Sequence, residues 1–182
     1  MRIISGAHKG KRITAPKKLP VRPTTDMAKE AIFNILNNRY YFDTLKVIDL
    51  FAGTGNISYE FASRGCKDII SVDAHHGCAK FIDTTARELG YTINAIKSDV
   101  YKYLERTNHR ADLIFADPPY DMSHELFAQI PKLVFDRNIL QEDGVLIIEH
   151  SKHMELSQLP YFSSQRKYGG SVFSFFALND TV

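Results

Sequence analysis

Short apolar runs alternate with amphipathic stretches along most of the chain that follows residue 45. The runs are rich in Val, Ile and Leu, which predicts buried strands, and the stretches between them repeat apolar residues at helical spacing. Strands that alternate with helices in this way predict an α/β fold with a mostly parallel sheet and helices on both faces. The predicted strands cover residues 47–51, 68–73, 93–97, 112–116 and 145–149, and the predicted helices cover 56–63, 77–89, 100–106 and 125–135.

The two ends of the chain depart from this alternation. Residues 162–168 and 171–178 flank two glycines, which predicts a tight turn and one antiparallel strand near the C-terminus of a seven-stranded sheet. Residues 2–5 and 11–14 predict the strands of an N-terminal hairpin. Prolines then predict an extended arm, and Thr25 or Asp26 can cap the helix that follows. We therefore divide the chain into a basic hairpin and arm at 1–24 and an α/β domain at 25–182.

The composition is that of a globular protein, with 44% hydrophobic and 24% charged residues in a chain of 182. This length suits one domain with a full core. No apolar run approaches membrane-spanning length and no signal segment opens the chain, so we expect a cytoplasmic protein without membrane contact. Cys66 and Cys78 have neither metal-ligand spacing nor a disulfide framework, which is typical of reduced thiols. Nothing suggests an obligate partner chain, and we expect a monomer.

Basic side chains gather at the N-terminus. Seven of the 23 Lys and Arg residues lie within residues 1–22, and none of the 21 acidic residues does. A basic arm on a mildly acidic body is typical of nucleic-acid binding, because Lys and Arg neutralise phosphates. A solvated polar hairpin is the alternative.

A glycine loop at residues 49–55 follows the first predicted strand. Gly53 and Gly55 let the backbone turn tightly and approach a ligand closely. A dinucleotide fingerprint would need a third glycine where this chain has Ser58. Asp49 can accept hydrogen bonds from an ammonium group, so the loop favours the amino-acid end of S-adenosylmethionine over a pyrophosphate. A plain turn between strand and helix is the alternative.

Acidic residues also follow or end three later strands. Asp73 ends the second strand, where an acid can hold the ribose of a nicotinamide or an adenosyl cofactor alike. Asp99 follows the third strand and could accept the adenine amine or simply cap the next helix. Asp117 follows the fourth strand. Because the carboxyl ends of parallel strands form the ligand-binding edge of an open sheet, we expect these acids to meet there.

A stiff turn, Asp117-Pro118-Pro119-Tyr120, comes directly after the fourth predicted strand. Each proline fixes its own φ and supplies a carbonyl without an N–H. The turn therefore presents a carboxylate, a carbonyl and an aromatic face together, which suits a planar group bearing an amine, such as a nucleobase. Ordinary turn formation is the alternative.

The histidines do not suggest a metal site. His75 and His76 stand beside Cys78 without a second ligand cluster, and Glu149 and His150 follow the fifth strand without a matching partner. We therefore expect no metal.

On these motifs the chain resembles the class I S-adenosylmethionine-dependent methyltransferases, specifically the RsmD-type 16S rRNA guanine-N2 methyltransferases of bacteria. Many N-methyltransferases share the Asp-Pro-Pro-Tyr motif, whereas the opening hairpin and the Arg-Pro-Thr-Thr-Asp segment are more particular to this family. Asn56 stands where the family usually has a small apolar residue. The matching segments run nearly end to end and are Arg2-Ile3-Ile4-Ser5-Gly6, Gly10-Lys11-Arg12, Arg22-Pro23-Thr24-Thr25-Asp26, Phe33-Asn34, residues 49–55, Ser63-Arg64-Gly65 and Asp117-Pro118-Pro119-Tyr120.

The resemblance implies a Rossmann-like class I fold and methyl transfer from S-adenosylmethionine to N2 of a guanine in small-subunit ribosomal RNA, free or within an assembling subunit. The catalytic turn would use Asp117 and the Pro118 carbonyl to accept hydrogens from the amine, while Tyr120 stacks on the base. The residues implied for the cofactor are Asp49, Phe51, Gly53 and Gly55 at the methionine end, Asp73 at the ribose and Asp99 at the adenine. The residues expected at the RNA are Arg2, Lys9, Lys11, Arg12, Arg22 and Thr24.

Two rival functions remain open. A DNA adenine-N6 methyltransferase uses the same kind of amine pocket, but we expect no room in this chain for a DNA target-recognition domain. A non-catalytic RNA-binding protein could keep the fold without the reaction, and cofactor binding would distinguish it from an enzyme.

Overall fold

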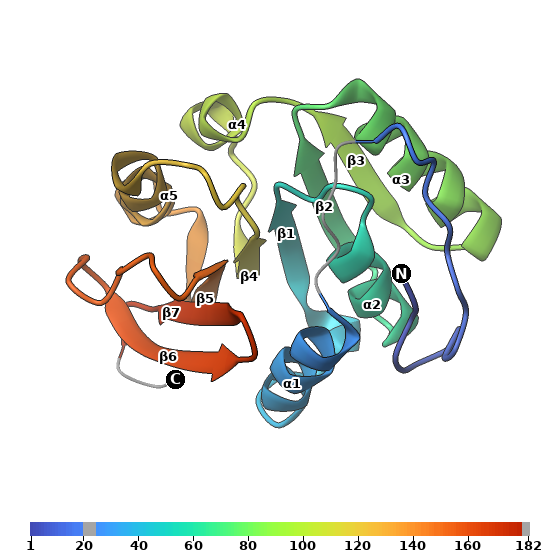
Figure 1. The fold of residues 1–182 in the computed structure, drawn as a ribbon, viewed down its shortest axis with the longest axis horizontal. Helices are drawn as coiled ribbons and strands as arrows, with labels where there is room; N and C mark the ends of the chain where they lie inside the picture. Colours follow the sequence, from blue (N-terminus) through green and yellow to red (C-terminus); the bar gives the residue numbers. More distant parts are fainter. Residues whose placement is uncertain (20–24, 180–182) are drawn as a thin grey trace.

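A computed structural model describes residues 1–19 and 25–179. The strands are β1 Lys46–Leu50, β2 Asp68–Asp73, β3 Ile93–Lys97, β4 Ala111–Ala116, β5 Leu140–Ser151, β6 Phe162–Tyr168 and β7 Ser171–Phe176. Within the described residues they form one 7-stranded sheet in the order β3-β2-β1-β4-β5-β7-β6 (Figure 1). β7 runs antiparallel to both of its neighbours, and the other pairs are parallel. The predicted sheet, with one antiparallel strand near the C-terminus, is thereby confirmed.

Helices cover both faces of this sheet, as predicted (Figure 1). The helices are α1 Asp26–Asn37, α2 Asn56–Ser63, α3 His76–Leu89, α4 Val100–Arg106 and α5 His124–Asp136. One buried cluster joins α1, α2 and α3 to one face through Ile32, Phe61 and Ile82, and a second joins α4 and α5 to the other. Neighbouring strand residues divide between the clusters, with Val47 in the first and Ile48 in the second, because side chains alternate along a strand. A short 3₁₀ helix at Phe42–Thr44 precedes β1.

The expected N-terminal hairpin is present, but within the described residues its strands are shorter than the predicted 2–5 and 11–14. The pairing is one antiparallel bridge between Arg2 and Arg12, beside which Met1 and Ile13 exchange two backbone hydrogen bonds of 3.0 and 3.1 Å. The segments still run together, since Ile3 N donates to Lys11 O at 2.9 Å. The next two amides turn away from the hairpin: Ile4 N and Ser5 N donate to the carboxylate of Glu60 on α2, at 2.8 and 3.0 Å. These two bonds anchor the first segment of the hairpin to α2.

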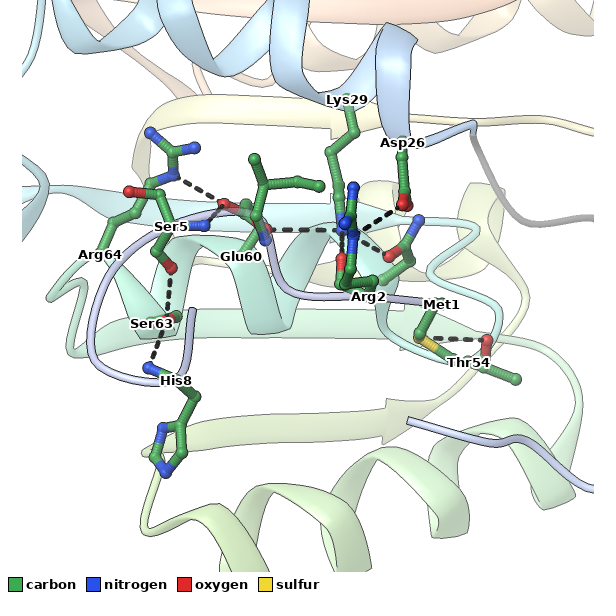
Figure 2. A network of polar contacts seen from close by, with 12 residues as sticks. Met1, Arg2, Ser5, His8, Asp26, Lys29, Thr54, Glu60, Ser63 and Arg64 are labelled. Atoms are coloured by element: carbon green, nitrogen blue, oxygen red, sulfur yellow. Dashed lines mark hydrogen bonds and ion pairs between the residues drawn. The ribbon is translucent and has the colours of Figure 1, made fainter. Parts of the chain in front are cut away.

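A buried ion pair holds the N-terminal segment against the domain (Figure 2). Lys29 on α1 and Glu60 on α2 are both fully buried, with Nζ and Oε2 3.4 Å apart. The Lys29 ammonium also donates to the backbone carbonyl of Arg2 at 2.6 Å and to Asn56 Oδ1 at 2.8 Å, while Arg64 Nε donates to Glu60 at 2.9 Å. Burial lowers the pKa of Lys29, and the charge of Glu60 offsets part of this shift. We call Lys29, Glu60, Asn56 and Arg64 the clamp.

Gly6 lets the segment lie directly on the end of α2. Its φ is +84°, and a Cβ there would fall 1.8 Å from the carbonyl oxygen of Ser63. The same serine accepts from Ala7 N through its carbonyl at 2.7 Å and donates its hydroxyl to Ser5 O at 2.7 Å. The N-terminal segment is therefore packed onto the α/β domain along α2 and α3, as the blue trace in Figure 1 shows.

Candidate active site

A cavity of about 520 Å³ opens at the carboxyl edge of the sheet. Its walls come from the ends of β1, β2, β4 and β5, from the glycine loop after β1 and from the starts of α1, α2 and α3. Asp49, Asp73 and Asp117 all line it, as predicted from their places at the ends of parallel strands. The lining residues are Thr25, Asp49, Phe51, Ala52, Gly53, Thr54, Asn56, Ile57, Asp73, Ala74, His75, Cys78, Asp117, Pro118, Pro119, Tyr120, Glu149 and Ser171.

The two glycines of the loop have different roles. Gly53 lines the cavity and its amide donates to Asp73 Oδ2 at 2.8 Å. Gly55 is the N-cap of α2 with φ +84°, and a Cβ there would lie 2.9 Å from atoms of Tyr59 and Ile82. Gly55 is therefore required for the close approach of α2 to its neighbours, and it does not line the cavity.

Asp49 is buried at the floor of the cavity with an exposed fraction of 2%. Ser58 Oγ donates to its carboxylate at 2.5 Å and lies 2.6 Å from Ser71 Oγ. Because each hydroxyl carries one hydrogen, Ser71 is the donor to Ser58 in this arrangement. Burial raises the pKa of Asp49 to about 7, although the hydrogen bond from Ser58 opposes the shift. Ser58, which stands where a dinucleotide fingerprint has its third glycine, is thus the residue that donates to Asp49.

Asp73 links β2 to the glycine loop. Its Oδ2 accepts from Gly53 N and its Oδ1 accepts from His75 N, both at 2.8 Å. These two bonds fix the carboxylate at the cavity wall, and each oxygen keeps a further lone pair that a hydroxyl group can use. The predicted contact with a ribose stays a prediction.

Asp99 is not brought to the cavity. It is the N-cap of α4, where its side chain accepts from Lys102 N at 3.0 Å, and it is exposed. The interpretation as a helix cap is confirmed, whereas the expected contact with an adenine stays a prediction.

The turn at Asp117–Tyr120 follows β4, which lies on the other side of β1 from β2 and Asp73, and all four of its residues line the cavity. Asp117 N donates to Leu50 O at 3.3 Å, which anchors the turn to the end of β1. Tyr120 Oη lies 3.4 Å from Glu149 Oε1 and 3.3 Å from Ser171 Oγ, and Ser171 donates to the same Glu149 oxygen at 2.7 Å. Acids therefore line the cavity on both sides of β1, with Asp73 on one side and Asp117 and Glu149 on the other.

Glu149 also lines the cavity, and we did not predict this from the sequence. We considered Glu149 only as a metal ligand beside His150 and rejected that role, although Glu149 stands near the end of β5, the next parallel strand after β4. The rule that located Asp49, Asp73 and Asp117 applies equally to β5. Applied once more, it would have placed Glu149 at the same edge.

The neighbouring groups do not supply a nucleophile or a metal centre. Burial raises the pKa of Cys78 to about 11, so its thiol stays protonated near neutral pH. Across residues 1–19 and 25–179, no group of three His, Cys, Asp or Glu side chains is arranged to hold a metal ion. In the same residues, no helix combines the length and apolar character needed to span a bilayer.

The basic N-terminal residues lie on the arm, away from the cavity lining. Lys9, Lys11 and Arg12 are exposed, and Arg2 forms an exposed ion pair with Asp26 at 3.0 Å. Arg22 and Thr24, the other residues expected at RNA, lie outside the described residues. That these residues contact RNA stays a prediction.

Comparisons with known proteins agree with this architecture. A family model described as Conserved hypothetical protein 95 matches residues 1–177. A Bacillus subtilis protein named Putative rRNA methyltransferase YlbH is 35% identical over 166 residues, which covers 87% of this chain and 86% of the relative. The Haemophilus influenzae Ribosomal RNA small subunit methyltransferase D is 27% identical, with 86% of this chain and 81% of the relative covered.

A solved structure gives the same fold at lower identity. The Thermus thermophilus 16S rRNA N2 G1207 methyltransferase (RsmC), in complex with AdoMet and guanosine, superposes with a TM-score of 0.69 at 18% identity. The match covers 87% of this chain and 45% of that chain. The fold is therefore the Rossmann-like fold of class I methyltransferases. With a family model that spans residues 1–177, the chain belongs to the family described as Conserved hypothetical protein 95, which the motifs identify as the RsmD-type methyltransferases.

Proposed function

We propose that this protein transfers a methyl group from S-adenosylmethionine to the exocyclic N2 amine of a guanine in small-subunit ribosomal RNA. The observation that carries the proposal is that one cavity joins Asp49 and the glycine loop to the Asp117–Tyr120 turn. The names of the relatives, an rRNA methyltransferase and a small-subunit methyltransferase, support the choice of reaction and RNA. RsmC, which shares the fold, was solved with AdoMet and guanosine, and this supports the choice of cofactor and base.

The groups at the Asp49 end fit S-adenosylmethionine, which supplies a methyl group bound to a positively charged sulfur. A cavity of about 520 Å³ is large enough for a cofactor of this size. The buried Asp49 carboxyl is complementary to the ammonium of the methionine part, which would favour the ionised form of the acid. Asp73 is placed to accept hydrogen bonds from the ribose, and Phe51 offers an apolar face at the same wall.

The groups at the Asp117 end suit a conjugated amine. Guanine N2 is a weak nucleophile because its lone pair is delocalised into the ring. Acceptors at Asp117 and the Pro118 carbonyl would favour a pyramidal nitrogen and stabilise the positive charge that develops on it during transfer. The protein must also hold the amine in line with the methyl group, and Tyr120 would hold the base by stacking. A paired base must first leave its stack to reach this cavity.

The basic arm would hold the RNA. Lys9, Lys11 and Arg12 are exposed on a segment that the clamp fixes to the domain. Each phosphate contact to a single strand would contribute about −0.7 to the slope of log affinity against log salt. We place the reaction in the cytoplasm with a monomeric enzyme, acting on RNA that is free or within an assembling subunit.

The test is Asp117→Ala, assayed on small subunits from a strain that lacks the gene. We expect methyl transfer to fall by at least about a hundredfold, because an interaction made in the transition state is lost. Cofactor binding, measured by calorimetry, should persist. Asp121→Ala is the matched control, since Asp121 is exposed just beyond the turn and does not line the cavity. Loss of cofactor binding in step with activity would contradict the role given to Asp117.

The same materials test the rival functions. Failure of the wild-type protein to bind S-adenosylmethionine would favour a non-catalytic RNA-binding protein. Mass spectrometry of ribosomal RNA from the deletion strain should show one guanine that has lost its methyl group. Unchanged guanine methylation there would contradict the RNA assignment and favour DNA adenine as the substrate.

A further inference from the structure

A second acid, Glu149, stands at the same end of the cavity as Asp117. Ala116 on β4 pairs with Ile148 on β5 in a parallel register, so Asp117 and Glu149 follow at the same level on adjacent strands. Neighbouring strands lie about 4.8 Å apart. Both residues line the cavity, and only 2% of Glu149 is exposed. The acceptor end of the cavity therefore presents two carboxyl groups side by side.

The position of the Glu149 carboxyl is set by its neighbours. Ser171, at the start of β7, donates to Oε1 at 2.7 Å. Tyr120 Oη donates to the same Glu149 oxygen in a weaker contact of 3.4 Å, and because Tyr120 also has one hydrogen, its 3.3 Å approach to Ser171 Oγ can only share that hydrogen. Both hydroxyls thus donate to Oε1 of Glu149, and this acid acts as an acceptor in each contact. A carboxylate oxygen accepts more than one hydrogen bond.

Guanine and adenine differ at the position next to the reacting amine. Guanine carries hydrogens on both N1 and N2, so that edge is a row of donors. In adenine, N1 is an acceptor beside the amine. A pair of adjacent carboxylates is complementary to the first arrangement and repels the second, and a buried acceptor left without its donor is costly.

We propose that Glu149 accepts the N1 hydrogen of the target base and thereby selects guanine over adenine. This inference rests on the proposed function, since Asp117 and Pro118 must receive the amine for N1 to face Glu149. β5 and β7 hold the acid on a paired sheet, so the acceptor is in place before the base arrives. In this arrangement Asp117 accepts a hydrogen bond from the reacting N2 amine, and Glu149 determines which base is accepted in the cavity.

The experiment is a cycle in which the enzyme and the base are each changed. Wild-type enzyme first identifies the target guanine by mass spectrometry of small subunits from the deletion strain. Small-subunit RNA is then joined from segments so that this position holds guanine or 2-aminopurine, and subunits are reconstituted. 2-Aminopurine keeps the amine at C2 but has no hydrogen on N1. Initial rates of methyl transfer are compared for the wild type and Glu149→Gln, a change that preserves the shape of the side chain.

We expect the wild type to prefer guanine by about 10- to 100-fold, the range for a hydrogen bond to a charged group. In Glu149→Gln the preference should fall to about threefold or less, because an amide can donate to the bare N1 of 2-aminopurine. Glu142→Gln makes the same change at an exposed position of β5 and should keep the wild-type preference. Thermal unfolding of each variant shows whether the fold is intact.

The outcomes separate this inference from the proposed function. If the wild type methylates guanine and 2-aminopurine equally well, the role of Glu149 is overturned while guanine methylation stands. The role is overturned in the same way if the base preference of Glu149→Gln equals that of the wild type. If the Glu149→Gln protein does not fold, Glu149→Ala replaces it, and a base preference equal to that of the wild type there overturns the role. A wild type that methylates neither RNA contradicts both proposals.

Discussion

Glu60 and Asp49 are both buried acids, and they are held in opposite ways. Glu60 pairs with Lys29 and Arg64 and accepts two backbone amides, so its charge is neutralised within the protein. Asp49 accepts from the hydroxyl of Ser58, and no ion pair among the described residues involves it. Burial accordingly raises the pKa of Asp49 to about 7. The charges of the clamp are paired within the protein, whereas a cationic ligand could pair with the charge of Asp49 in the cavity.

The largest effect is expected from Glu60→Gln, which leaves the buried Lys29 ammonium without its counter-ion. Removing one partner of a buried pair costs about 3–5 kcal/mol of unfolding free energy. Urea unfolding measures this loss. Asp26→Asn, which breaks the exposed pair with Arg2, is the control and should cost no more than about 1 kcal/mol. Equal losses in the two variants would mean that the clamp does not stabilise the protein as proposed.

The next effect tests how closely the N-terminal segment must lie on α2. Gly6 and Gly10 have nearly the same φ, +84° and +83°, but only a Cβ at Gly6 would meet another atom, the Ser63 carbonyl. Gly10→Ala should cost about 1–2 kcal/mol, the penalty for a side chain in the left-handed region. Gly6→Ala should cost clearly more, because the segment must also move off the helix. Chemical unfolding of both variants decides the point, and similar losses would show that the close approach is unimportant.

The prediction that is most informative for the cavity concerns the pH dependence of stability in the wild type and in Asp49→Asn. The folded pKa of about 7 lies above the usual 3.8, so between about pH 4 and 7 the folded state keeps a proton that the unfolded chain has released. Stability should therefore decrease as the pH rises through this range, and Asp49→Asn should remove the decrease. Thermal unfolding across the range, without cofactor, measures it.

Cofactor affinity should show the opposite trend with pH. A cationic ligand favours the ionised acid, so affinity for S-adenosylmethionine should rise between about pH 5.5 and 7, by at most about tenfold per pH unit. Calorimetry of the wild type and Asp49→Asn compares the two profiles. A wild-type profile as flat as that of the variant would show that Asp49 does not face the ammonium group.

The local pattern predicted most of the sheet. β2, β3, α2 and α4 have the bounds expected from apolar periodicity, because each element buries residues at its own period. β5 is longer than expected and begins at Leu140, which pairs with Ala111 ahead of a register shift. That pairing depends on a distant strand and leaves no periodic signal. The positions of acids at the carboxyl ends of the strands likewise predicted Asp49, Asp73 and Asp117, three of the four acids that line the cavity.

The predictions from sequence failed where contacts between two distant segments decide the structure. Lys29 and Glu60 look like ordinary surface charges on two helices, and nothing local marks them as a buried pair. The amides of Ile4 and Ser5 donate to that pair's carboxylate, a contact with α2 that the hairpin pattern alone does not predict. Asn56, which departs from the family's usual residue, accepts from the Lys29 ammonium at 2.8 Å.

The sequence by itself determined the alternation of elements, the acids at the strand ends and the stiff Asp117–Tyr120 turn, since each depends on neighbours along the chain. The tertiary structure decided which of those acids share a cavity, how Glu149 comes to lie beside Asp117, and how the N-terminal segment is fastened. These outcomes depend on strand order, register and burial. Such properties arise only when segments far apart in the chain exclude water from the groups between them.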